Sequence, residues 1–167
     1  MIFDGLFKEG LKEGKGIYDD GNIRIEGMYQ KGKLNGKGIF TSKNGEKYEG
    51  EFVNGLKDGH GKFTSKNESY EGTFKDNKKN GFGILYLNDK DRKLTYKGDF
   101  LDDKFDGEGE LIIEGMAYIK GHFKNGKIHG QHKYMIKITT LNMMVILLRV
   151  KKKETMKNKY MKMILFI

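Results

Sequence analysis

The fold of this chain is decided by the stretch Tyr48-Glu49-Gly50-Glu51-Phe52-Val53-Asn54-Gly55 and its continuation Asp58-Gly59-His60-Gly61-Lys62-Phe63. The same ladder of glycines and aromatic or aliphatic residues occurs six times, in copies that begin at Phe3, Ile25, Tyr48, Tyr70, Tyr96 and Ile119. Successive copies start 22, 23, 22, 26 and 23 residues apart. A nearly fixed period of this length indicates an array of small supersecondary units, and the extended surfaces of such arrays serve for binding.

The glycines show how strictly the copies agree when the first residue of each copy is numbered as offset 0. Offsets 2 and 11 are glycine in all six copies, offset 13 in five and offset 7 in four, which accounts for 21 of the 24 glycines. No glycine follows residue 130. The repeats therefore occupy residues 3–134, and residues 135–167 form a tail of a different kind.

Within a copy the residues alternate with the period of a β-strand. Asn54-Gly55 and Asn125-Gly126 favour a two-residue type I′ hairpin turn, because both central positions need a positive φ. A turn centred on offsets 6 and 7 pairs offset 2 with 11, 1 with 12 and 0 with 13. Opposite charges across the hairpin support this register, in the pairs Asp4 with Lys15, Glu26 with Lys37, Glu49 with His60 and, with both signs reversed, Lys97 with Glu108.

One face of these hairpins carries the aromatic residues and the glycines. We expect the ring of Tyr48 to lie over Gly61 and that of Tyr70 over Gly83, as in aromatic rescue of strand glycines. The rings at offset 4 allow two interpretations. They form the core between stacked hairpins, or exposed members of the row bind a partner, and the candidate binding row is Tyr29, Phe52, Phe74 and Phe100.

Turn residues also stand between the copies, at Asp20-Gly21, Asn44-Gly45 and Asn88-Asp89. Every strand should therefore pair with the next one along the chain. The predicted fold is all-β, an elongated and curved single antiparallel meander of six stacked hairpins. Twelve strands would span roughly 55 to 60 Å.

With Tyr48-x-Gly50-x-Phe52 and Gly59-x-Gly61-x-Phe63 in view, the chain resembles the MORN repeat family (membrane occupation and recognition nexus) over residues 3–134. The departures are Phe3, Ile25 and Ile119 in place of tyrosine, and Asn77 and Asp103 in place of turn glycines. The resemblance implies a β-hairpin solenoid that binds partner proteins or phospholipid surfaces. It implies no catalytic residues within the repeat and no cofactor.

The net charge of +9 is concentrated in the tail, since residues 135–167 carry +7 and the repeats +2. Glutamates stand between the rings of the repeats and would repel phosphate, which argues against nucleic-acid binding. The chain contains no cysteine. Together with the lack of a signal peptide, this predicts a cytoplasmic location, at the periphery of a membrane or the cytoskeleton.

Three interpretations of the tail compete. It is a helix that caps the end of the sheet, or an anchor whose candidate membrane contacts are Arg149, Lys151, Lys152 and Lys153, or a frameshifted continuation of the array. The third has a specific basis: the codons of Met143-Met144-Val145, read one nucleotide earlier, encode Asp-Gly. The apolar run 143–148 is too short to span a bilayer, which takes about 20 residues.

Other chemistry finds little support in the sequence. No copy completes a phosphate-binding Gly-x-Gly-x-x-Gly motif, and no serine or histidine recurs with a carboxylate as in a catalytic triad. His122, His129 and His132 cluster without a cysteine, so we predict surface histidines and no metal site.

These observations give three functional hypotheses. The first is a non-catalytic scaffold that holds a partner peptide or helix. The second is a membrane tether that uses the basic tail to bind anionic lipid. The third is the repeat portion of a larger enzyme, such as a phosphatidylinositol phosphate kinase or a SET-type methyltransferase.

Overall fold

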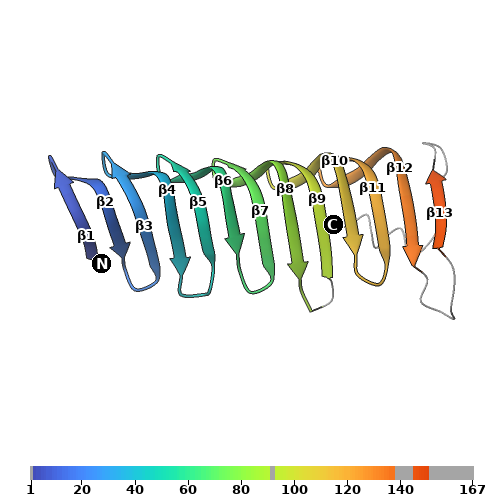
Figure 1. The fold of residues 1–167 in the computed structure, drawn as a ribbon, viewed down its shortest axis with the longest axis horizontal. Coiled ribbons are helices and arrows are strands. Elements are labelled where there is room, and N and C mark those ends of the chain that lie inside the picture. Colours follow the sequence, from blue (N-terminus) through green and yellow to red (C-terminus); the bar gives the residue numbers. More distant parts are fainter. Residues whose placement is uncertain (1, 91–92, 138–144, 151–167) are drawn as a thin grey trace. The chain divides into compact units, whose positions relative to one another are not determined.

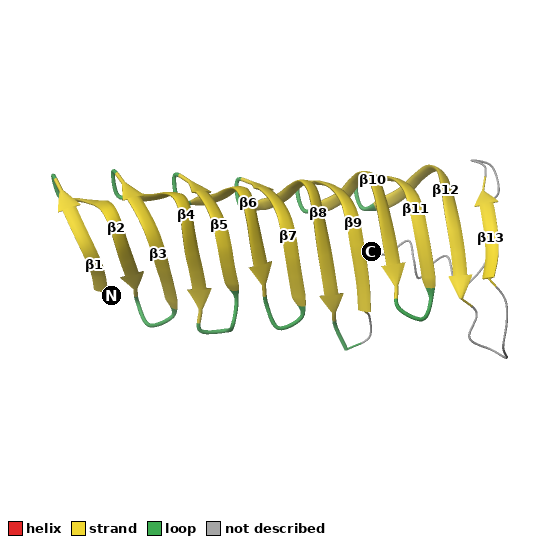
Figure 2. Ribbon diagram, viewed as in Figure 1, coloured by secondary structure: helices red, strands yellow, loops and turns green. Residues whose placement is uncertain are grey.

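The computed structural model of the chain describes residues 2–90, 93–137 and 145–150 (Figure 1). It divides into two compact units, residues 1–80 and 81–167. The described residues form thirteen strands and no helix (Figure 2). Each unit is an antiparallel meander in which strand order follows chain order, so the prediction of an all-β meander of hairpins is confirmed. No helix in the described part of the chain is long and apolar enough to cross a membrane.

The first unit holds the first three repeats and the beginning of the fourth. Its strands are β1 (Ile2–Lys8), β2 (Leu11–Asp19), β3 (Ile23–Gln30), β4 (Lys33–Ser42), β5 (Lys47–Val53), β6 (Leu56–Thr64) and β7 (Glu68–Lys75). Each hairpin, such as β5–β6, is one repeat. The second strand of one hairpin pairs with the first strand of the next, as β4 pairs with β5 and β6 with β7.

The second unit continues the same plan. Its strands are β8 (Lys78–Asn88, in this unit from residue 81), β9 (Lys93–Leu101), β10 (Lys104–Ile113), β11 (Ala117–Lys124), β12 (Lys127–Lys137) and β13 (Val145–Val150). All neighbouring pairs from β8–β9 to β12–β13 are antiparallel.

The tips of the hairpins have the predicted turn. At Asn54 and Gly55 φ is 51° and 84°, and at Asn125 and Gly126 it is 51° and 77°. All six hairpins have positive φ at both central residues, which matches the right-handed twist of the flanking strands. Asn77 and Asp103, the two replacements of a turn glycine, keep this geometry with φ of 70° and 67°.

Beyond the turn the predicted register is wrong. In the third repeat Gly50 faces Gly61 and not Gly59. Three residues, 58–60, lie opposite the single residue Glu51, so the second strand of the hairpin contains a bulge. Offsets 2, 1 and 0 consequently pair with offsets 13, 14 and 15, two positions later than predicted.

The bulge also replaces the predicted charge pairs. Offset 1 now faces offset 14, so that Asp4 faces Ile17, Glu26 faces Ile39, Glu49 faces Lys62 and Lys97 faces Glu110. Other ion pairs join neighbouring repeats: Lys62 Nζ lies 3.4 Å from Glu71 Oε2, and Lys120 Nζ lies 2.6 Å from Glu110 Oε1.

Backbone conformation explains why offset 11 is always glycine. All six of these glycines have a positive φ, from 72° at Gly14 and Gly130 to 107° at Gly59. A residue with a Cβ is strained in this conformation. The glycine is therefore required by the bulge, and not by a facing glycine as the predicted register implied.

The tail differs from the helical alternative where the structure describes it. Residues 135–137 end strand β12, and Val145–Val150 form β13, which pairs with β12. The helix interpretation is therefore wrong for 145–150, because this segment extends the meander through backbone hydrogen bonds. Residues 138–144 and 151–167 lie outside the described part of the chain.

Candidate binding surface

Glycines face one another in a row that crosses each unit from strand to strand. In the first unit the row runs Gly5, Gly16, Gly27, Gly38, Gly50, Gly61, Gly72. In the second it runs Gly83, Gly98, Gly109, Gly121. A row without side chains leaves a furrow in one face of the sheet, and side chains from offsets 0, 4 and 9 fill it.

The offset-0 rings cover this row as the sequence predicted. A Cβ placed on Gly61 would lie 2.5 Å from Tyr48 Cε2, and one on Gly98 would lie 2.7 Å from the Tyr96 hydroxyl. Phe3 has the same position over Gly5. The predicted cover of Gly83 by Tyr70 concerns residues of two units and stays a prediction.

Burial places the tyrosine hydroxyls against backbone carbonyls. The three offset-0 tyrosines, Tyr48, Tyr70 and Tyr96, are fully buried. Each hydroxyl donates to the carbonyl of offset 3, at 3.0 Å for Tyr48 to Glu51 and for Tyr96 to Asp99. Burial of the phenol, which disfavours the phenolate, raises the pKa of Tyr48 to about 12 and raises the pKa of Tyr96 as well.

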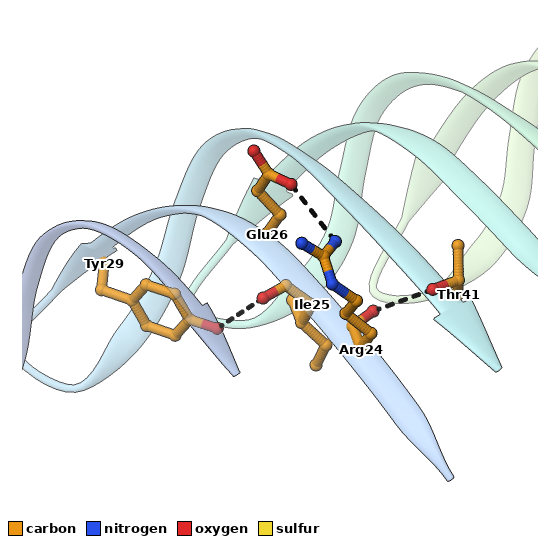
Figure 3. Close-up of polar contacts among 5 residues, drawn as sticks. All are labelled: Arg24, Ile25, Glu26, Tyr29 and Thr41. Atoms are coloured by element: carbon orange, nitrogen blue, oxygen red, sulfur yellow. Dashed lines mark hydrogen bonds and ion pairs between the residues drawn. The ribbon is translucent and has the colours of Figure 1, made fainter. Parts of the chain in front are cut away.

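The second repeat has other residues at these positions. Figure 3 shows the contact that its Tyr29 hydroxyl makes. It has Ile25 at offset 0, and its hydroxyl comes from Tyr29, which donates to the Ile25 carbonyl at 3.4 Å. Leu34 supplies the cover, since a Cβ on Gly27 would lie 2.9 Å from its Cδ1. The residues on either side of Ile25 form an ion pair, in which the Arg24 guanidinium lies 3.3 Å from Glu26 Oε2 (Figure 3).

The candidate partner-binding row is buried. Tyr29, Phe52, Phe74 and Phe100 are between 3% and 6% exposed. Their rings pack edge to face against offset-0 rings, as in Tyr48–Phe52 at 5.0 Å and Tyr48–Phe74 at 5.1 Å between centroids. The row therefore forms the core between hairpins, and it lacks the exposed surface that the partner-binding interpretation required.

Lysines at offset 9 complete the aromatic layer, a role that sequence reasoning missed. Lys57 Nζ lies 5.1 Å from the ring centroid of Tyr48, 4.8 Å from Phe63 and 5.8 Å from Phe74. Lys12 lies in the same way among three rings of the first two repeats. Cation–π attraction and the aliphatic stem make each lysine part of the packing.

Side chains at offset 10 link successive turns, and this too was missed. Glu13, Asn35 and Asp106 each accept the N–H of the offset-6 residue in the next repeat at 3.0 Å. The signal was present in the sequence, because offset 10 is Asp, Asn or Glu in the first five copies.

Exposed apolar side chains gather on the opposite face of the second unit. Phe82, Tyr86 and Ile112 are 53%, 52% and 46% exposed. Tyr86 faces Thr95, which faces Ile112, which in turn faces the half-buried Tyr118. We name Phe82, Tyr86, Ile112 and Tyr118 the outer strip. Their neighbours Leu85 and Leu111 are buried on the core side, because successive strand residues point to opposite faces.

The predicted polar sites are placed as follows. His122 Nδ1 lies 3.3 Å from Glu108 Oε1, and the rings of His122 and His129 are 6.1 Å apart. Within residues 2–90, 93–137 and 145–150 no group of three or more side chains could hold a metal ion. Arg149 belongs to strand β13. Lys151, Lys152 and Lys153 lie outside the described residues.

A comparison with known families agrees with this geometry. The sequence profile of the MORN repeat matches six segments, residues 3–22, 26–47, 48–69, 70–92, 96–113 and 120–131. No curated protein matches the chain.

Proposed function

Because this chain belongs to the MORN repeat family, we propose that it is a non-catalytic scaffold that binds a partner protein. The observation that carries the proposal is the outer strip on the second unit. Adjacent exposed apolar side chains on a folded surface mark interaction sites. Tyr86, Ile112 and Tyr118 lie in one register over β8, β10 and β11, with Thr95 of β9 between Tyr86 and Ile112. Phe82 lies on the same face of β8, where it faces Asp99.

The chemistry of the strip indicates the kind of partner. Three aromatic rings and an aliphatic side chain offer anchors for the apolar side of a peptide or an amphipathic helix. Lys97 and Asp99 on β9 lie beside the strip, facing Ile84 and Phe82. The partner peptide or helix suggested by the sequence is thus retained, but its site moves from the buried row to the opposite face.

A matched pair of variants tests this function. We expect Phe82→Ser/Tyr86→Ser/Ile112→Thr to lose at least about 90% of a specific partner in quantitative affinity capture, since aromatic anchors each contribute about 1 to 2 kcal/mol or more. Met28→Ser/Val53→Ser/Leu101→Thr removes equally exposed apolar side chains elsewhere and should capture the partner as the unmodified chain does. Equal capture by both variants would reject the strip as the site.

The concentration of positive charge in the tail supports a second function, attachment to anionic membranes. Each basic side chain near such a surface contributes about 1 kcal/mol. We expect full-length Lys151→Gln/Lys152→Gln/Lys153→Gln to sediment at least about tenfold less with phosphatidylserine vesicles than the unmodified chain. Lys43→Gln/Lys66→Gln/Lys90→Gln removes the same charge from loops between repeats. If both variants lose binding equally, the tail is not the anchor.

The third hypothesis, the repeat portion of a kinase or methyltransferase, makes a genetic prediction. A catalytic domain would be encoded in the same transcript, and sequencing of the transcript tests this. The same experiment tests the frameshift hypothesis, because codons that exclude Tyr-Asp-Gly in the shifted frame at residues 142–145 would reject it.

A further inference from the structure

The first strand exposes an aromatic ring that the other repeats of its unit bury. In β1, Leu6 is 71% and Phe7 is 60% exposed. Phe7 stands at offset 4, where Tyr29, Phe52 and Phe74 of the same unit are at most 6% exposed. The offset-4 ring is therefore exposed to solvent in the first repeat and buried in the later repeats of the unit.

The pairing between repeats explains the difference. Each buried offset-4 ring faces the offset-11 glycine of the preceding repeat, as Tyr29 faces Gly14 and Phe74 faces Gly59. Tyr29 and Phe74 also touch the offset-0 ring of the preceding repeat, with 5.1 Å between the centroids of Tyr29 and Phe3 and of Phe74 and Tyr48. Among the described residues no strand pairs with the outer edge of β1, so Phe7 has neither neighbour.

The sequence of β1 is complementary to itself in one antiparallel register. If two copies of β1 pair about a two-fold axis at Leu6, Asp4 of each copy faces Lys8 of the other, and this occurs twice. Gly5 faces Phe7 of the other copy, which repeats the glycine–aromatic pairing found between hairpins. A register centred on Gly5 would instead place Asp4 opposite Leu6 and leave both charges without an opposite partner.

We propose that β1 is a self-association edge, at which two copies of this chain pair antiparallel about Leu6. The unpaired N–H and C=O groups of an edge strand form a template for a further strand, and a two-fold contact uses the same surface on both copies. The pairing would bring Phe7 against a glycine and join the two sheets. The inference is independent of the outer strip, which lies in the second unit.

Charge reversal tests the register in the full-length chain. We expect the unmodified chain to form a dimer that dissociates on dilution in analytical ultracentrifugation. Asp4→Lys or Lys8→Asp alone places two like-charged pairs across the axis and should raise the dimer dissociation constant about tenfold. Asp4→Lys/Lys8→Asp restores both opposite-charge pairs and should restore dimerisation. Lys66→Asp, on the loop after β6, changes the net charge by the same amount as Lys8→Asp and should have no effect.

A cysteine at the axis gives a second readout. The chain has no cysteine, so any disulfide formed by Leu6→Cys joins two copies at this position. Directly facing residues of antiparallel strands have Cα atoms about 4.5 to 5.5 Å apart, within the range of a disulfide. We expect mild oxidation to cross-link Leu6→Cys and not Lys66→Cys.

Three results would overturn the proposal. The first is a chain that stays monomeric at all concentrations up to about 0.5 mM. The second is a double charge variant that associates no better than the single variants. The third is equal cross-linking of the two cysteine variants.

Discussion

In the third repeat the ring of Tyr48 lies over the facing pair Gly50 and Gly61, whereas in the second repeat Leu34 covers the equivalent glycines beside Ile25. The strand register on either side of the bulge is the same in both repeats. The comparison shows that the glycine row must be covered by a side chain that fills the space above it, and that this side chain can be aromatic or aliphatic. A ring at offset 0 with a lysine at offset 9, or an aliphatic residue at each position, fills the same space.

The largest loss of stability is expected from a substitution at Gly61, because the Tyr48 ring leaves no room for a side chain there. Gly61→Val should lower the free energy of unfolding by about 3 kcal/mol, because its Cβ would collide with the buried Tyr48 ring and the facing backbone of Gly50. Urea denaturation monitored by circular dichroism measures the change. Lys62→Val, the next residue on the exposed face, serves as control and should change stability by less than about 1 kcal/mol. Equal losses would mean that the ring does not limit the site.

The comparison predicts that offsets 0 and 9 are coupled. Ile25→Tyr should cost about 2 kcal/mol, because Leu34 already occupies the space over the glycines. Adding Leu34→Lys converts the second repeat to the arrangement of Tyr48 and Lys57 and should recover at least half of the loss. A double-mutant cycle from thermal or urea unfolding gives the coupling energy. Additive effects of the two substitutions would contradict the alternative-cover explanation.

The hydroxyl of Tyr48 should have a smaller effect with a characteristic pH dependence. Tyr48→Phe removes the bond to the Glu51 carbonyl and should cost about 1 kcal/mol near pH 7. The folded protein has a Tyr48 pKa of about 12, above the ordinary value of 10.0. As pH rises from about 10 to 12, the unfolded chain ionises first, so this contribution to stability is lost. The unmodified chain should therefore destabilise more steeply than Tyr48→Phe, and parallel curves would contradict the assignment.

The smallest effect is expected at the turns, where the two repeats also differ. The first turn residue is Lys31 in the second repeat and Asn54 in the third, with φ of 48° and 51°. Asparagine tolerates positive φ better than lysine does. Lys31→Asn should raise stability by about 0.5 kcal/mol and Asn54→Lys should lower it by a similar amount. Thermal unfolding of the two variants should shift in opposite directions.

Most of the fold could be predicted because the signals are local. The repeat period, the alternation of side chains and the Asn-Gly turns each depend on neighbouring residues, and each prediction is confirmed. The register failed because Gly59 and Gly61 look alike in the sequence. Only the backbone shows that Gly59 has a positive φ within a bulge, while Gly61 faces Gly50.

The candidate site was harder to predict for a related reason. Alternation identifies which residues share a face, but not which face is covered. Phe52 and Phe74 are buried because rings and lysines of adjacent repeats close over the glycine row, and this depends on residues about 20 positions apart. The exposed Phe82 and Tyr86 follow the same alternation, yet their face has no such row to receive a cover.

The sequence by itself determined that this chain is a six-copy MORN repeat array of hairpins, since each turn and each strand follows from residues close together. The tertiary structure decided the pairing beyond the bulge, the burial of the aromatic row and the open edge at β1. These features arise only when one hairpin meets the next. Packing between repeats sets which glycine faces which, and the first strand alone in its unit exposes the ring that every later repeat covers.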